Sequence, residues 1–141
     1  MIVFAAIFVI LAVFPSVLPK SPDFEGVVRE FSEVESKAVN AYNSLVEAAS
    51  AGVTDEAFAK GIEDEVLPVW RHVQPRLDEA ATQLRNPQQT KVLKALRQYW
   101  GDRAYGWTQM ILALRAHNKP FLEWTTKADA EAVKKFKDSI K

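Results

Sequence analysis

Cysteine is absent from the 141 residues of the sequence. This absence excludes disulfide bonds, thiol nucleophiles, iron–sulfur clusters and cysteine-ligated zinc together. Histidine is almost as scarce, with only His72 and His117. A di-iron helical bundle needs Glu-x-x-His pairs, but the residues three positions before these histidines are Val69 and Leu114. We therefore expect neither a metal site nor a cofactor.

Recognisable catalytic patterns are also lacking. Glu63, Asp64 and Glu65 are consecutive, so on a helix they point in different directions and cannot form one compact metal shell. Gly101 and Gly106 do not have the G-x-G-x-x-G spacing of a phosphate loop, and no predicted strand precedes them. No nucleophile–base pair accompanies His72. The sequence therefore predicts a protein that is not an enzyme.

An excess of one charge is missing too, because 18 basic and 18 acidic residues cancel. The charges are nevertheless unevenly spread: residues 21–86 carry 13 acidic and 6 basic side chains, and residues 87–141 carry 5 acidic and 11 basic ones. Such asymmetry marks either a charged binding face or two halves that pack together and neutralise each other. The basic residues are scattered rather than clustered, which favours the second interpretation and argues against a nucleic-acid partner.

A long apolar run opens the sequence. Between Ile2 and Leu18 only Pro15 and Ser16 are not strongly apolar. As a helix this run would rise about 26 Å, close to the roughly 30 Å of a bilayer core. It has neither the preceding basic residues nor the small-residue cleavage site of a secretory signal, so a cleaved signal is the less favoured alternative. We predict a single-pass membrane protein in which residues 1–20 form an anchor and 21–141 an extramembrane domain. Its side of the membrane is not fixed by the charges, with the extracytoplasmic side favoured.

Four amphipathic helices are predicted after the anchor. The first has Ser21 as N-cap and Pro22 as first residue, and Gly52 ends it. The second begins at Thr54 and contains Pro68 and Pro75, each of which predicts a kink or break. The third follows the loop "RNPQQ", and the fourth follows "HNKP" with an apolar stripe at Phe121, Trp124, Ala128, Ala132, Val133, Phe136 and Ile140. With no predicted strand and short connections, we expect an all-α, antiparallel up-and-down bundle of about four helices.

Aromatic residues supply the candidates for a partner or ligand surface. They are Tyr99, Trp100, Tyr105 and Trp107 in the third helix, with Trp70 and His72 in the second. Trp100 and Trp107 follow the helical spacing of a buried stripe, which favours a core role over an aromatic groove. Tyr99 and Tyr105 fall off that stripe and are predicted to be exposed. For His72 we favour a surface or structural role.

A basic side of the third helix is formed by Lys91, Lys94, Arg97, Arg103 and Arg115. One interpretation is contact with anionic lipid headgroups near the membrane. The favoured alternative is a solvated face that pairs with acidic neighbours on the first helix.

Three stretches, "SPDF", "VESKAVNAYNSLV" and "FAKGIEDEVLPVW", resemble the helical region that follows the last membrane span in some bacterial rhomboid-family membrane proteins. The resemblance would cover most of residues 21–141. It carries over no catalytic residue, because the Gly-x-Ser-Gly serine and the membrane-embedded histidine of a rhomboid protease are not found here. It implies an interacting or regulatory role. We therefore predict a membrane-anchored interaction or scaffold module with a protein partner, the alternative being a binder of a small apolar or lipid ligand within the bundle.

Overall fold

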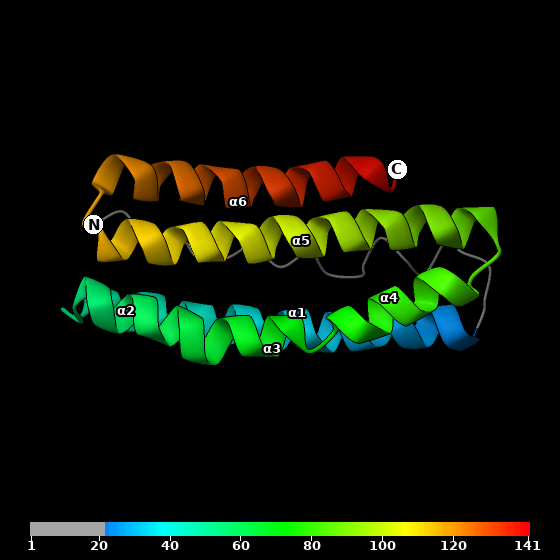
Figure 1. Cartoon of the computed structure of the whole chain (residues 1–141), viewed down its shortest axis with the longest axis horizontal. Helices are drawn as coiled ribbons and strands as arrows, with labels where there is room; N and C mark the ends of the chain where they lie inside the picture. The colour runs from blue at the N-terminus through cyan, green and yellow to red at the C-terminus, as the bar shows by residue number, and fades with distance from the viewer. Residues whose placement is uncertain (1–21) are drawn as a thin grey trace.

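Four helical rods pack side by side in the computed structural model, which describes residues 22–141, with side chains from residue 24 (Figure 1). The first rod is α1 (Pro22–Ser50), the third is α5 (Pro87–Arg115) and the fourth is α6 (Lys119–Ser139). The second rod consists of α2 (Asp55–Gly61), the π-helix η2 (Ile62–Val66), α3 (Leu67–Arg71) and α4 (Gln74–Gln83). The prediction of an all-α bundle of four helices is confirmed. The predicted anchor, residues 1–20, lies outside the described residues.

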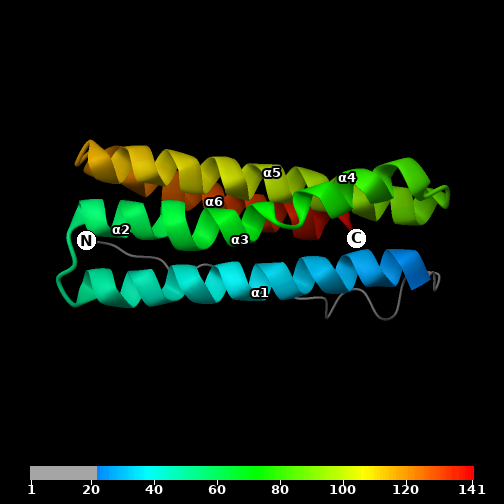
Figure 2. The same cartoon turned by 60° about the horizontal axis from the view of Figure 1, so that its bottom comes forward.

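Backbone packing follows the order of the chain. The second rod lies between α1 and α5, and α6 packs mainly on α5 (Figure 2). Within residues 22–141, no helix is both long enough and apolar enough to cross a bilayer. The amphipathic stripes of these helices bury a common core.

The helix ends follow their local sequence closely. Gly52 has a φ of 105°, a conformation that glycine adopts without the steric cost of a side chain. Its N–H donates to Ala49 O, and the N–H of Val53 donates to Ala48 O, which is the Schellman pattern that ends a helix. Thr54 then caps α2, because its hydroxyl accepts from the N–H of Ala57. The predicted end of the first helix and start of the second are confirmed.

The next two helix starts use asparagine. Asn86 accepts from the N–H groups of Gln88 and Gln89, so α5 begins at Pro87, inside the stretch that we predicted to be a loop. Asn118 accepts from the N–H of Phe121 and begins α6.

Both prolines of the second rod interrupt it as predicted. Before Pro68 the N–H of Leu67 donates to Ile62 O, five residues back, which makes η2 a π-turn. Before Pro75 the α-helix stops at Arg71, and α4 starts again at Gln74. Proline has no N–H and its ring crowds the preceding turn, which explains both positions.

The π-turn has a consequence for packing. Phe58, Ile62, Val66 and Trp70 are each four residues apart and all are buried. In a continuous α-helix this spacing would rotate Trp70 by about 120° from Phe58. The extra residue held in the π-turn takes up most of that rotation, so that all four side chains face the core.

Aromatic rings fill the centre of the core. Trp70 meets Phe31, Tyr99 and Trp107 at centroid distances of 5.5, 6.0 and 5.4 Å. Tyr99 also stacks on Phe136 of α6 at 5.0 Å. These rings bring all four rods to one centre, and the space between the described helices is occupied by side chains there.

Trp124, predicted on the apolar stripe of the fourth helix, does not lie in the core, because its side chain is 50% exposed. Trp124 lies about 100° around α6 from the buried Thr125, which places it at the side of the helix rather than on its inner face.

Candidate functional site

A buried arginine lies at the centre of the bundle. Arg103 of α5 is 0% exposed and forms a two-pronged ion pair with Asp129 of α6: Nε donates to Oδ1 at 3.0 Å and Nη2 to Oδ2 at 3.1 Å. Its Nη1 donates to the hydroxyl of Tyr99 at 2.8 Å and lies 3.7 Å from Oε1 of Glu35. Arg103 thereby connects α5 to α6 and to α1.

Tyr99 links the arginine to the second carboxyl group. Its hydroxyl accepts from Arg103 and donates to Oε1 of Glu35 at 2.5 Å. Burial raises the pKa of Tyr99, and the nearby Glu35 raises it further against the opposing effect of Arg103. The phenol is therefore neutral and acts as a fixed donor to Glu35.

The charge of Arg103 is stabilised by more than carboxylates. Its guanidinium carbon lies 4.8 Å from the ring centroid of Trp107, 5.7 Å from that of Tyr99 and 6.0 Å from that of Trp70. Burial lowers the pKa of Arg103, but Asp129 and Tyr99 outweigh burial and the net shift is upward. The guanidinium stays charged in the core.

Two polar groups near this cluster are poorly satisfied. The indole Nε1 of Trp107 is buried without a hydrogen-bond partner. The hydroxyl of Tyr42 donates to a weak acceptor, Sδ of Met110, at 3.3 Å, and burial raises the pKa of that tyrosine. Both groups are less favourable than the fully bonded contacts around Arg103.

The chemistry open to this centre is limited. Glu35 and Arg103 are 1% and 0% exposed, so neither presents a reactive group to solvent. Groups of three or more His, Asp or Glu side chains placed to hold a metal ion are not found among residues 22–141. Removing an ion pair from water costs free energy that offsets much of its Coulombic gain, and in some proteins such buried groups specify which elements pack together. We interpret the centre as the feature that sets the relative positions of α1, α5 and α6.

Two members of this centre do not lie where they were predicted from the sequence. Tyr99 was predicted to be exposed and Arg103 to lie on a basic surface, but both are buried. Helix α5 packs against α6 on one side and the second rod on another, and it faces α1 across the core. Its buried face is therefore wider than a single apolar stripe. Glu35 and Asp129 were missed. The signal was present: Arg103 lies four residues from both Tyr99 and Trp107, and Glu35 lies four residues from the buried Phe31.

The remaining predicted aromatic positions divide between core and surface. Trp107 and Trp70 are fully buried, and Trp100 is half-buried against the core. Tyr105 is 59% exposed, as predicted, and His72 is exposed in the break between α3 and α4.

The basic residues of α5 do not form one surface. Lys91, Lys94 and Arg97 are exposed near its start, and Arg97 donates to Asp78 of α4 at 3.0 Å. Arg115 lies at its other end and pairs with Glu56 and Glu63 of the second rod. Arg97 and Arg115 thus have acidic partners, as expected, but these partners lie on the second rod rather than on the first helix.

A pocket of about 370 Å³ lies between α4 and α5 near Lys94. Its walls combine cationic, amide and apolar groups from the two helices: Gln74, Leu77, Asp78, Lys94, Arg97, Gln98, Trp100 and Gly101. A smaller pocket lies at the end of the bundle, where the α5–α6 turn meets Asp55.

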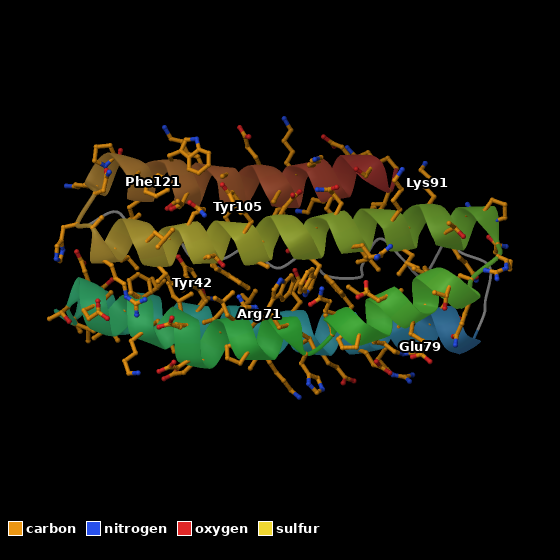
Figure 3. The ribbon with its side chains drawn as sticks, viewed as in Figure 1. Tyr42, Arg71, Glu79, Lys91, Tyr105 and Phe121 are labelled. Carbon is orange, nitrogen blue, oxygen red and sulfur yellow. The ribbon has the colours of Figure 1, made fainter. Side chains whose placement is uncertain are left out.

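An exposed apolar surface lies further along α5. Tyr105 and Leu112, 59% and 52% exposed, are two helical turns apart on one face. On α6, Trp124 stacks on Phe121 at a centroid distance of 5.7 Å. We call these four residues the outer patch. Figure 3 shows Tyr105 and Phe121 on the half of the bundle that α5 and α6 form.

An ion pair indicates that the two halves of the outer patch flank one seam. Lys135 Nζ of α6 lies 3.9 Å from Oδ2 of Asp102 of α5, and so bridges these helices on their outer side. Tyr105 is one turn from Asp102, and Trp124 is three turns from Lys135 on the same stripe of α6. The two exposed aromatics therefore both border the α5–α6 seam.

Comparisons of this chain with protein-family models, with curated proteins and with solved structures find no match. The resemblance to a rhomboid-associated helical region thus stays a prediction from the sequence.

Proposed function

We propose that this chain is a non-enzymatic, membrane-anchored interaction module whose outer patch binds a protein partner. The observation that carries this proposal is the distribution of side chains between core and surface. The carboxylate of Glu35, the phenol of Tyr99 and the guanidinium of Arg103 are buried and paired with one another. Large apolar side chains, in contrast, are left in solvent along α5 and α6.

The composition of the outer patch suits protein binding. Tyr and Trp are the residues that contribute most to binding energy at interfaces, because each combines a large apolar area with a polar atom. Tyr105 and Trp124 are 59% and 50% exposed, and Leu112 is 52% exposed beside them. Single exposed apolar residues are ordinary on a protein surface, but three large ones on the outer sides of two packed helices favour a binding face.

The shape of the outer patch favours a helical partner. Tyr105 and Leu112 are about 10 Å apart along α5, and Phe121 and Trp124 continue the surface on α6. An apolar strip parallel to two antiparallel helices matches the apolar face of an amphipathic helix, which would lie along the seam. The rim supplies both signs of charge through Asp102 and Lys135, so polar contacts on either side are available.

A site-specific crosslinking experiment tests the proposal. A photoreactive amino acid is placed at Tyr105 or Leu112 of the full chain in cells, and at Val53 as the control. Val53 is a 41% exposed apolar residue on the loop between α1 and α2, away from the outer patch. We expect one discrete adduct from the two patch positions, weakened by Trp124→Ala, and none from the control. Equal adducts from Val53, or none from the patch, would overturn the proposal.

The anchor is tested separately by fractionation. Full-length chain is expected in membranes after an alkaline carbonate wash, while a variant that lacks residues 2–18 is expected in the soluble fraction. Protease protection of the washed membranes then gives the side on which the bundle lies. Release of the full-length chain by the wash would contradict a membrane-spanning anchor while leaving the partner proposal intact.

A further inference from the structure

We infer that the pocket between α4 and α5 binds a phosphate-bearing ligand through Lys94 and Arg97. None of the residues that line the pocket belongs to the outer patch, so this inference does not depend on the proposed protein partner. Its volume of about 370 Å³ is within the range of small-molecule sites.

The cations of the pocket are arranged for an anion. Lys94 and Arg97 are three residues apart, and on a helix this spacing puts both side chains on the same face. Arg97 is held in place by its 3.0 Å bond to Asp78 through one Nη atom, while its guanidinium has further N–H donors. Lys94 has no ion-pair partner within the described chain. The two cations exceed the one carboxylate in the lining, so the pocket is complementary to negative charge.

A phosphate fits this set of donors better than a single carboxylate. An ammonium, a guanidinium and the side-chain amide of Gln74 present donors from two helices, and a phosphate has three oxygens able to accept from them. The lining also includes two apolar side chains, those of Leu77 and the half-buried Trp100. The ligand class is therefore a phosphate group attached to a carbon skeleton, either a soluble phosphate ester or the headgroup of a lipid.

Gly101 supplies an independent observation. It lies in the middle of α5, where glycine costs roughly 0.5–1 kcal/mol of stability relative to alanine. Packing does not require it, because a Cβ built at this position would meet no atom within 4 Å. Gly101 lines the pocket, so the absence of a side chain there leaves that part of the pocket open. A residue that weakens its helix while enlarging a charged pocket is typical of a binding site.

Lysine footprinting tests the inference on the full chain, with Lys91 as the matched control. Lys91 is exposed on the same helix, one turn before Lys94, but does not line the pocket. The rate at which an acylating reagent modifies each lysine is measured by mass spectrometry. One arm adds inorganic pyrophosphate to the detergent-solubilised chain, and the other compares vesicles of phosphatidylcholine alone with vesicles that also contain phosphatidylglycerol.

We expect several-fold protection of Lys94 and little protection of Lys91 in at least one arm. Protection by pyrophosphate identifies a soluble ligand, and protection only in the anionic vesicles identifies a lipid headgroup. Arg97→Met should lower the affinity for the protecting ligand about tenfold, as expected for the loss of a charge-assisted hydrogen bond. Gly101→Leu should abolish protection by filling the pocket, while the circular dichroism of the bundle stays unchanged.

Three results would overturn the inference. Equal protection of both lysines would indicate diffuse attraction of anions to the surface of α5. Absence of protection in both arms would show that the pocket takes no phosphate. Full protection in the Gly101→Leu variant, with a folded bundle, would place the anion outside the pocket.

Discussion

Trp70 and Trp100 exchange hydrogen bonds between their side chains and backbones. The indole N–H of Trp70 donates to the carbonyl oxygen of Trp100 at 2.9 Å, and that of Trp100 donates to the carbonyl oxygen of Trp70 at the same distance. Trp70 lies in the last turn of α3, where helix carbonyls lack some of their usual partners. The exchange therefore joins α3 to α5 at the point where the second rod is interrupted.

Removing one of these donors should destabilise the bundle. Trp100→Phe keeps an aromatic ring but loses the N–H that satisfies the carbonyl of Trp70. We expect the free energy of unfolding to fall by about 1–2 kcal/mol, measured by urea denaturation. Trp124→Phe is the matched control, because that indole is half exposed, and it should change stability by less than about 0.5 kcal/mol. Equal effects of the two substitutions would show that the exchanged bonds contribute nothing.

Loss of the central arginine should be far more costly. Arg103→Met leaves the carboxyl groups of Glu35 and Asp129 in the core without their cation, and removal of one partner of a buried pair costs about 3–5 kcal/mol. Arg97→Met breaks an exposed pair with Asp78 and should cost at most about 1 kcal/mol.

A double replacement separates charge from volume in this centre. Adding Asp129→Asn to Arg103→Met removes one uncompensated charge, so we expect it to recover part of the stability in the same urea titration. If the double variant is as unstable as Arg103→Met alone, lost packing rather than buried charge explains the effect.

Alkaline pH should destabilise the bundle through two tyrosines. Burial raises the pKa of both Tyr42 and Tyr99, so above about pH 10 the unfolded chain releases protons that the folded chain retains. The contribution to stability is complete below that pH and is lost above it, by about 1.4 kcal/mol per pH unit for each tyrosine. The free energy of unfolding is measured at several pH values above about 10, with phenolate absorbance as the probe, and its slope against pH is determined. Tyr42→Phe should halve this slope. An unchanged slope in that variant would contradict the attribution of the pH dependence to Tyr42 and Tyr99.

Two glycines should respond oppositely to alanine. At Gly101 a Cβ meets nothing within 4 Å, so Gly101→Ala should stabilise the bundle by roughly 0.5–1 kcal/mol. At Gly61, also helical, a Cβ would collide with the partly buried side chain of Leu45, lying only 2.9 Å from Cδ1, so Leu45 has to shift and Gly61→Ala should destabilise the bundle by about 1 kcal/mol. Thermal denaturation of the two variants side by side checks the difference in sign.

Local signals in the sequence predict much of this fold. Gly52, Thr54, Pro68 and Pro75 mark the ends and interruptions of helices because each acts on the backbone of its own turn. Such effects need no knowledge of what packs against the helix.

Tertiary contacts decide the features that the sequence did not predict. Whether Arg103 faces lipid, solvent or Asp129 depends on the position of α6, whose Asp129 lies 26 residues further along the chain. Tyr99 was assigned to the surface because it falls beside an apolar stripe, whereas α6 covers that side of α5 through Phe136. A charged residue at helical spacing between two aromatics is the pattern that would have indicated a buried pair.

The π-turn at Ile62–Val66 also determines where the chain can change length. Deleting a residue from an ordinary α-helix turns everything beyond it by about 100° and moves its buried side chains out of the core. Within η2 the surplus residue is already present, so a chain that is shorter by one of Glu63, Asp64 or Glu65 would close into a regular helix with Phe58 and Trp70 still facing inward. The second rod thus contains a segment where the deletion of a single codon preserves the core, whereas the same deletion within α2 or α4 would turn buried side chains outward.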